Sequence, residues 1–129
     1  LVIGATNEPP VIPHLRWNEL GALAWVFAIS PRHALAKAPE PLEREVIAQH
    51  RAIVVADSSR RPDARSYGVL GGQAILAVPS MRAKVLAQCE ALGVGWLPRQ
   101  RIAAELASGA LVERRVSDPR EPNTLYVGW

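Results

Sequence analysis

Apolar residues in this chain fall into short runs, which are separated by stretches rich in Gly, Pro and polar residues. Residues 20–30, "LGALAWVFAIS", form a long run rich in β-branched and aromatic side chains, and Pro31 ends it. Residues 53–56, "IVVA", are apolar at every position, which is typical of a strand covered by helices on both faces. The same reasoning predicts further strands at residues 1–4, 74–79, 94–97, 111–116 and 124–127.

Helices are predicted between these strands, at residues 43–50, 80–92 and 99–107. In the middle one, Ser80 is the expected N-cap, and one apolar stripe is formed by Met81, Val85, Cys89 and Leu92. Gly93 is expected to end this helix in the left-handed region, and Gly95 to let the next strand approach a neighbour. Helices that alternate with buried strands indicate an α/β fold.

Composition narrows the class of protein. With 129 residues, 49% of them apolar and 21% charged, the chain suits one globular domain, and no apolar run is long enough to span a membrane. A net charge of +3 is too balanced to demand nucleic acid as a partner. A single cysteine fits a reducing compartment. The first residues lack Met and a basic region, so we expect no signal peptide and a chain cut from a larger protein.

Candidate catalytic and metal-binding motifs are weak. Gly93-Val94-Gly95 follows a predicted helix and leads into a strand, the reverse of a nucleotide-binding loop. Cys89 lies on the apolar stripe and is expected to be inert core, and the three histidines lack metal-ligand spacing. The residues around Ser58 do not match the Gly-x-Ser-x-Gly motif of serine nucleophiles. We therefore expect no catalytic residue, no metal and no cofactor.

Two predicted strand ends carry polar residues that suit a ligand. In open α/β sheets, ligands bind beyond the carboxyl ends of the strands. Asp57, Ser58 and Ser59 follow one strand, where the serines either cap a turn or contact a small ligand. Ser80 and Met81 follow another strand and open a helix, whose first N–H groups suit an anion such as a carboxylate. Met81 either packs in the core or contacts that ligand.

Several blocks of the sequence occur together in one known family. They are residues 1–5 "LVIGA", 25–36 "WVFAISPRHALA", 50–59 "HRAIVVADSS", 78–112 "VPSMRAKVLAQCEALGVGWLPRQRIAAELASGALV" and 125–129 "LYVGW". The longest block combines a helix, a Gly-x-Gly turn, a strand ending in Leu-Pro and a helix that closes at Gly before Leu-Val. In this order, the blocks resemble the effector-binding domain of LysR-type transcriptional regulators.

The resemblance implies a two-lobed α/β fold like that of type II periplasmic binding proteins. By position it implies part of the first lobe in residues 1–30, the second lobe in 31–114, and a return crossover with a first-lobe strand in 115–129. The first crossover is expected near Ser30-Pro31. The family's first βαβ unit, its last helix and its winged helix-turn-helix have no counterpart in the chain. The family's helix after Asp57-Ser58 is expected to be reduced or absent in residues 59–73, "SRRPDARSYGVLGGQ".

The resemblance also implies a function. We expect a cytoplasmic regulatory domain that binds a small polar or anionic metabolite between its lobes, without chemistry and without membrane contact. The full-length protein is expected to be a homodimer or tetramer that binds DNA only through its missing N-terminal domain. A solute-binding protein for transport is the main alternative and an enzyme the second, and the absence of a signal peptide and the free cysteine disfavour transport. The implied effector contacts are Ala5, Thr6, Ser58, Ser59, Ser80, Met81 and Trp96.

Trp96 is the unusual member of this set, because the family usually has a small aliphatic residue at this position. Two interpretations remain open. Its indole either fills the core, or it narrows the pocket and stacks on a flat effector.

Overall fold

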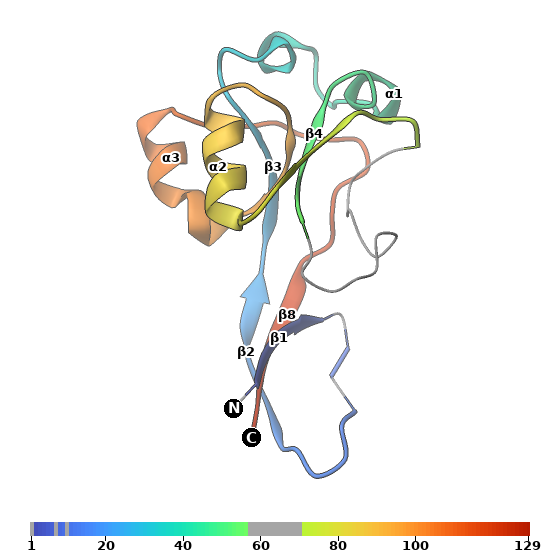
Figure 1. The fold of residues 1–129 in the computed structure, drawn as a ribbon, viewed down its shortest axis with the longest axis vertical. Helices are drawn as coiled ribbons and strands as arrows, with labels where there is room; N and C mark the ends of the chain where they lie inside the picture. Colours follow the sequence, from blue (N-terminus) through green and yellow to red (C-terminus); the bar gives the residue numbers. More distant parts are fainter. Residues whose placement is uncertain (1, 7, 10, 57–70) are drawn as a thin grey trace.

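The computed structural model describes residues 2–6, 8–9, 11–56 and 71–129. Its shape is elongated, with a broad part that carries the helices and a narrow part that holds both chain ends (Figure 1). The elements are β1 Val2–Thr6, β2 Trp17–Leu23, β3 Trp25–Ile29, η1 Ala34–Lys37, α1 Arg44–Ile47, β4 Ala52–Val55, β5 Ile75–Val78, α2 Met81–Cys89, β6 Gly95–Pro98, η2 Arg99–Ile102, α3 Ala103–Ser108, β7 Val112–Glu113 and β8 Asn123–Gly128.

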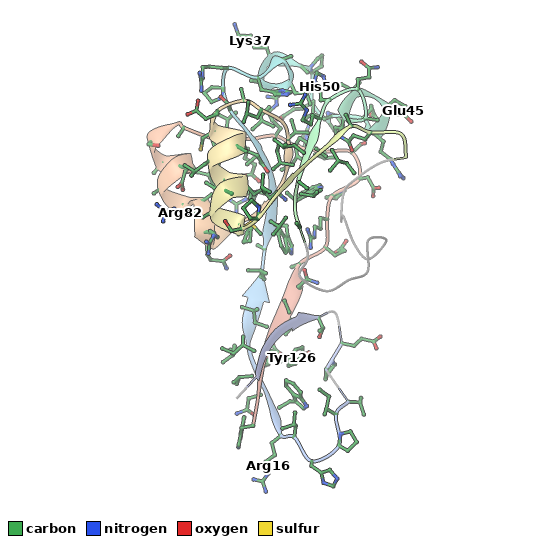
Figure 2. The ribbon with its side chains drawn as sticks, viewed as in Figure 1. Arg16, Lys37, Glu45, His50, Arg82 and Tyr126 are labelled. Atoms are coloured by element: carbon green, nitrogen blue, oxygen red, sulfur yellow. The ribbon has the colours of Figure 1, made fainter. Side chains whose placement is uncertain are left out.

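The narrow part is a three-stranded antiparallel sheet of β1, β8 and β2, here called the terminal sheet. β8 lies in its centre, paired with β1 from Val2–Gly128 to Thr6–Thr124 and with β2 along its other edge. Tyr126 of β8 is buried, whereas Ile3 and Leu20 expose 63% and 56% of their surface (Figure 2). The sheet therefore contributes little to the buried core.

The broad part contains a second sheet, here called the helix-covered sheet. In it β3 pairs with β6 and β7 in antiparallel fashion, and β4 pairs with β5 in parallel. Two backbone hydrogen bonds, from Ile53 N to Val94 O and from Val94 N to Arg51 O, both 2.9 Å, join β4 to the residue that precedes β6. The five strands thus lie in the order β5-β4-β6-β3-β7, as a two-stranded and a three-stranded sheet joined by a single parallel bridge between Ala52 and Val94.

The core lies on both faces of the helix-covered sheet, because successive side chains of a strand point to opposite faces. Val26 and Ala28 of β3 pack with Val85 of α2 and Ile102 of η2 on one face. Phe27 and Ile29 pack on the other face with side chains from η1 and α1, namely Leu35 and Ile47. The predicted α/β fold, with buried strands between helices, is confirmed.

The apolar run at residues 20–30 is two strands and not one. β2 belongs to the terminal sheet, β3 belongs to the helix-covered sheet, and Ala24 lies between them. The chain therefore passes from the terminal sheet to the helix-covered sheet at Ala24, before the position near Ser30-Pro31 where the crossover between lobes was expected. Hydrophobicity could not show the change of sheet, since both strands are apolar. β5 was also predicted to be buried, but it is an edge strand in which Ile75 is 50% exposed.

The middle helix has the predicted N-terminus. The Ser80 hydroxyl oxygen accepts a hydrogen bond from Ala83 N at 3.1 Å, so the N-cap is confirmed. The helix ends at Cys89, three residues earlier than expected, and Leu92 is 49% exposed. Ala91 has the left-handed conformation after this helix, with φ of 59°, and Gly93 does not. The role predicted for Gly93 was therefore wrong.

The two flanking helices are shorter than predicted. α1 covers only Arg44–Ile47, with Ile47 buried but Val46 partly exposed to solvent. Residues 99–107, predicted as one helix, divide into η2 and α3, and Ala103 at the start of α3 is exposed. Gly109 ends α3 with φ of 82°, as its sequence context predicted.

Glycine is required at positions 93 and 95 because neighbouring atoms lie too close to leave room for a Cβ atom, and not because a turn requires it. A Cβ atom at Gly93 would lie 2.6 Å from Arg51 O and 2.6 Å from Ile53 Cδ1. A Cβ atom at Gly95 would lie 3.0 Å from Gln88 Oε1 and 3.1 Å from Lys84 Cε. The expectation that Gly95 permits a close approach is confirmed. Gly93 does the same at the seam between β4 and β6.

Gly93→Ala should destabilise the fold, because its Cβ would collide with the backbone of β4's neighbour Arg51. We expect the free energy of unfolding in urea to fall by about 2 kcal/mol, the cost of overpacking a rigid site. Gly71→Ala is the matched control, since no atom lies within 4 Å of its Cβ position. The control should change stability by less than about 0.5 kcal/mol. Equal effects of the two substitutions would contradict this account of the seam.

Candidate functional site

A cavity of about 720 Å³ lies against β3 and β6, where the segment between β7 and β8 passes. Its wall includes Phe27 and Trp96, which pack on the sheet face opposite α2. Both connections between the two sheets border the cavity, one through Trp25, which follows Ala24, and the other through residues 114–120. The lining residues are Trp25, Val26, Phe27, Glu40, Pro41, Trp96, Glu113, Arg114, Arg115, Val116, Ser117, Pro119 and Arg120.

The aromatic residues of the wall are fixed by specific contacts. Trp96 meets Phe27 edge to face, with ring centroids 5.5 Å apart and an interplanar angle of 71°. Trp25 donates a hydrogen bond of 2.7 Å from Nε1 to Asn123 Oδ1. The guanidinium carbon of Arg120 lies 3.4 Å from the centroid of the Trp25 ring, a cation–π contact.

The acidic residues of the wall are paired with cations. Glu40 Oε1 lies 3.2 Å from Arg114 Nη1 and also accepts a hydrogen bond from Arg115 N. Glu113 forms an ion pair of 2.8 Å with Arg99, whose side chain lies outside the lining. Among the described residues, the wall thus holds three arginines and two glutamates, and both glutamates are ion-paired.

A buried lysine lies next to this wall. Lys84 of α2 is 8% exposed and donates a hydrogen bond of 2.7 Å to the Trp96 carbonyl oxygen. Burial, followed by the charge of Arg120, lowers the pKa of the Lys84 ammonium from 10.5 to about 8. Lys84 also borders a void of about 10 Å³, and Phe27 and Trp96 line both this void and the larger cavity. The ammonium group therefore adds positive charge behind the Trp96 strand.

Gln88, one turn after Lys84 on α2, is fully buried. It donates hydrogen bonds from Nε2 to Ala28 O at 2.7 Å and to Gly95 O at 3.3 Å. Its Oε1 atom has no hydrogen-bond partner in the part of the chain that the structure describes. Polar side chains of α2 thus form hydrogen bonds to backbone carbonyl oxygens of both β3 and β6.

The residues that the sequence singled out as effector contacts are dispersed. Trp96 lines the cavity, and its half-buried side chain also packs on the core. Ser80 is exposed, and Met81 packs against the core cluster of α2 and η2. Ala5 and Thr6 end β1 in the terminal sheet, where the Thr6 hydroxyl donates to Glu8 O. Ser58 and Ser59 lie outside the described residues.

Sequence reasoning missed most of the cavity wall. Trp25 lies inside the apolar run at residues 20–30, and no motif singled out the Arg114-Arg115 pair. Arg120 lies in the predicted return crossover. That location, between the lobes, was the one signal that could have identified it.

The rest of the described chain offers little for catalysis or metal binding. No group of three or more His, Cys, Asp or Glu residues that could hold a metal ion occurs among the described residues. Burial, together with the charges of Glu105 and Glu90, raises the pKa of the Cys89 thiol, which opposes formation of a nucleophilic thiolate. Within the described ranges, no helix is long and apolar enough to cross a membrane.

Lys84→Met should change how stability depends on pH. Because the pKa of Lys84 is about 8 in the folded chain and 10.5 when unfolded, the unfolded chain binds more protons between these values. The free energy of unfolding therefore rises with pH in that window. At pH 7 the Met variant should be more stable than the parent by up to about 3 kcal/mol, and this advantage should shrink towards pH 10.5.

Urea unfolding at pH 7 and pH 10.5 measures the effect. Lys37→Met is the matched control, because Lys37 is exposed, and its difference from the parent should be the same at both pH values. An advantage of Lys84→Met that does not change with pH would show that the ammonium is not desolvated.

The sequence model of the LysR substrate binding domain family matches residues 1–129. An Escherichia coli (strain K12) protein described as the uncharacterized HTH-type transcriptional regulator YeeY is 36% identical over 129 residues, which are all of this chain and 42% of that protein. The HTH-type transcriptional activator AllS of Klebsiella pneumoniae is 32% identical over 112 residues, or 87% of this chain and 42% of AllS. The chain thus spans less than half the length of these relatives.

Solved structures of the family share the fold. ArgP from Mycobacterium tuberculosis superposes with a TM-score of 0.72 at 21% identity, over 98% of this chain and 44% of ArgP. The regulatory domain of AphB in Vibrio vulnificus superposes with a TM-score of 0.70 at 18% identity, over 98% of this chain and 64% of that domain. The expected fold, that of LysR regulatory domains with their mixed α/β architecture, is confirmed, and the chain belongs to the LysR substrate-binding domain family.

Proposed function

We propose that this chain is the effector-binding regulatory domain of a cytoplasmic LysR-type transcription factor whose DNA-binding part lies outside these residues. The observation that carries the proposal is the cavity of about 720 Å³ beside the connections between the two sheets, in a chain that matches the family along its whole length. Its volume is in the range of small-molecule sites. Relatives named as transcriptional regulators support regulation over transport.

We propose that the two sheets belong to the two lobes expected from the sequence. The expected division was residues 1–30, 31–114 and 115–129. We move its first boundary to Ala24, because β3 pairs with β6 and β7. The terminal sheet then belongs to the first lobe and the helix-covered sheet to the second.

The position of the cavity suggests how an effector would act. Trp25 follows one connection between the sheets, and Arg120 belongs to the other. A ligand that contacts both would favour one angle between the sheets and so shift the population of conformations. In the intact protein this shift would alter the arrangement of a homodimer or tetramer on DNA.

The proposed effector is a small polar or anionic metabolite. LysG of Corynebacterium glutamicum, solved with bound effector Arg, shares the fold at 20% identity and a TM-score of 0.66. The contacts expected from the sequence stay proposals: Ala5, Thr6, Ser58, Ser59, Ser80, Met81 and Trp96. Of the described ones, Trp96 lines the cavity, and Ala5, Thr6, Ser80 and Met81 lie outside its lining. No catalytic residue, metal or cofactor is proposed. A thermal-shift screen of carboxylates, amino acids and purines tests the proposal, and a complete effector domain that responds to none of them would reject it.

Ser80→Asp tests whether an anion binds at the start of α2. Aspartate is as good an N-cap as serine, so the helix should keep its hydrogen bond to Ala83 N while it gains a negative charge. The affinity for an anionic effector, measured by calorimetry, should fall by about threefold or more. Ser80→Asn, which caps without charge, is the matched control. Equal affinity of the two variants would remove Ser80 from the site.

DNA binding should be absent from this part of the protein. With 15 basic and 12 acidic residues, the chain should bind a generic duplex no better than a neutral protein at physiological salt. Fluorescence anisotropy with a labelled duplex measures this. Tight binding that weakens steeply with added salt would contradict the proposal that the DNA-binding part lies outside these residues.

A further inference from the structure

We infer that His33 and His50 form a pH-sensitive switch at the start of η1, in the segment that leads from β3 to the wall of the cavity. The neutral imidazoles stabilise this segment, and their protonation in mild acid destabilises it and loosens the wall. The inference goes beyond the proposed effector role, because it concerns the response of the fold itself to pH, and its test requires no effector.

His33 is the N-cap of η1, and its side chain is the hydrogen-bond acceptor of the cap. Its Nδ1 atom accepts a hydrogen bond of 3.0 Å from Leu35 N, and its backbone has the extended conformation that is usual at an N-cap. A histidine can accept this bond only while Nδ1 carries no proton, because both ring nitrogens of the imidazolium ion are donors. The cap of η1 therefore depends on the neutral form of His33.

The ring of His50 lies against the ring of His33. Their centroids are 5.0 Å apart at an interplanar angle of 63°, an edge-to-face contact. His50 follows α1 and lies at the top of the broad part (Figure 2), where its N–H donates to Ile47 O at 3.0 Å and its carbonyl oxygen accepts from Gln73 Nε2 at 2.8 Å. Two imidazolium ions at this separation would repel each other. Protonation thus removes the cap and places like charges side by side.

The surroundings of the two rings offer no compensating negative charge. Among the described residues, neither histidine forms an ion pair with a carboxylate. Arg32, next to His33 in the chain, is engaged elsewhere, with Glu90 at 3.6 Å and Cys89 O at 3.1 Å. The other charged side chains on the neighbouring elements are exposed, namely Lys37 on η1, Glu43, Arg44 and Glu45 at α1, and Arg51 before β4.

The sign of the pH effect follows from the environment of His33. Burial, followed by the charge of His50, lowers the pKa of the His33 imidazole from its ordinary value of 6.5. An opened segment, in which His33 has its ordinary pKa, therefore binds the proton more readily than the closed one. The stability of the closed segment is complete above pH 6.5 and falls as the pH drops from 6.5 towards the lowered pKa.

The segment that His33 caps also supports the cavity wall. The Ala38 carbonyl oxygen, directly after η1, accepts a hydrogen bond from the Arg114 guanidinium. Two residues later, Glu40 Oε1 accepts a hydrogen bond of 3.1 Å from Arg115 N. Glu40, Arg114 and Arg115 all line the cavity. A loss of the cap at His33 would therefore weaken contacts that position the wall.

Hydrogen–deuterium exchange of the full-length protein, measured by mass spectrometry at pH 7.0 and pH 5.5, tests the switch. Protection factors, corrected for the intrinsic pH dependence of exchange, are compared for peptides that cover residues 33–38 and 113–117. We expect both protection factors to fall by about fivefold at pH 5.5, which corresponds to the loss of one typical N-cap.

His33→Asn separates the proton from the cap. Asparagine is a good N-cap that does not titrate, so this variant should keep both protection factors within about twofold at pH 5.5. His14→Asn is the matched control, because His14 is exposed between β1 and β2 and its φ of 70° suits asparagine. It should respond to pH as the parent does. His50→Gln, which removes the neighbouring charge, should reduce the fall but retain part of it.

Three results would overturn the inference. The parent protein could keep its protection at pH 5.5, which would show that the cap does not depend on a neutral histidine. An equal fall in the parent and in His33→Asn would assign the pH effect to another group. A fall in residues 33–38 that residues 113–117 do not share would disconnect the switch from the cavity wall. The effector role is independent of these results, because the thermal-shift screen tests it at neutral pH.

Discussion

The broad part of the molecule depends on the contact between β4 and the residue before β6. Two backbone hydrogen bonds of 2.9 Å at Val94 join strands that would otherwise form separate sheets. They form because Gly93 has no side chain where Arg51 O and Ile53 Cδ1 come within 2.6 Å of its Cβ position. Once β6 is fixed beside β4, its pairing with β3 sets Trp96 against Phe27. The position of Trp96 in the cavity wall thus depends on the lack of a side chain at Gly93, a few residues before it.

Beneath this contact, α2 contributes more than apolar packing. Lys84 and Gln88 direct their polar ends at carbonyl oxygens of β3 and β6, where the strands leave room for them. Buried polar groups require partners, and here the strands' own carbonyls provide them. Desolvation opposes the charged form of this lysine, so its burial lowers the stability of the fold at neutral pH.

Local chemistry was predictable from the sequence, and long-range placement was not. The Ser80 cap and the Gly109 terminus depend on neighbouring residues, so their motifs identified them correctly. The change of sheet at Ala24 depends on which strands β2 and β3 pair with. The hydrophobicity of an apolar run does not indicate its pairing partners. Trp25 and Arg120 lie 95 positions apart in the chain, yet they stack in the cavity wall. Of the candidate contacts, Trp96 was identified because a tryptophan was unexpected at its position, and the other wall residues carried no such signal.

The hydrogen bond between Trp25 and Asn123 has a mechanical consequence. Trp25 begins β3 just after the first connection between the sheets, and Asn123 begins β8 just after the second. A bond of 2.7 Å between them ties the two connections together at the level where the sheets meet. A twist of one connection would strain this hydrogen bond unless the other connection moved with it. Arg120 contacts the same indole, so a displacement of its guanidinium would also disturb the contact that links the two connections.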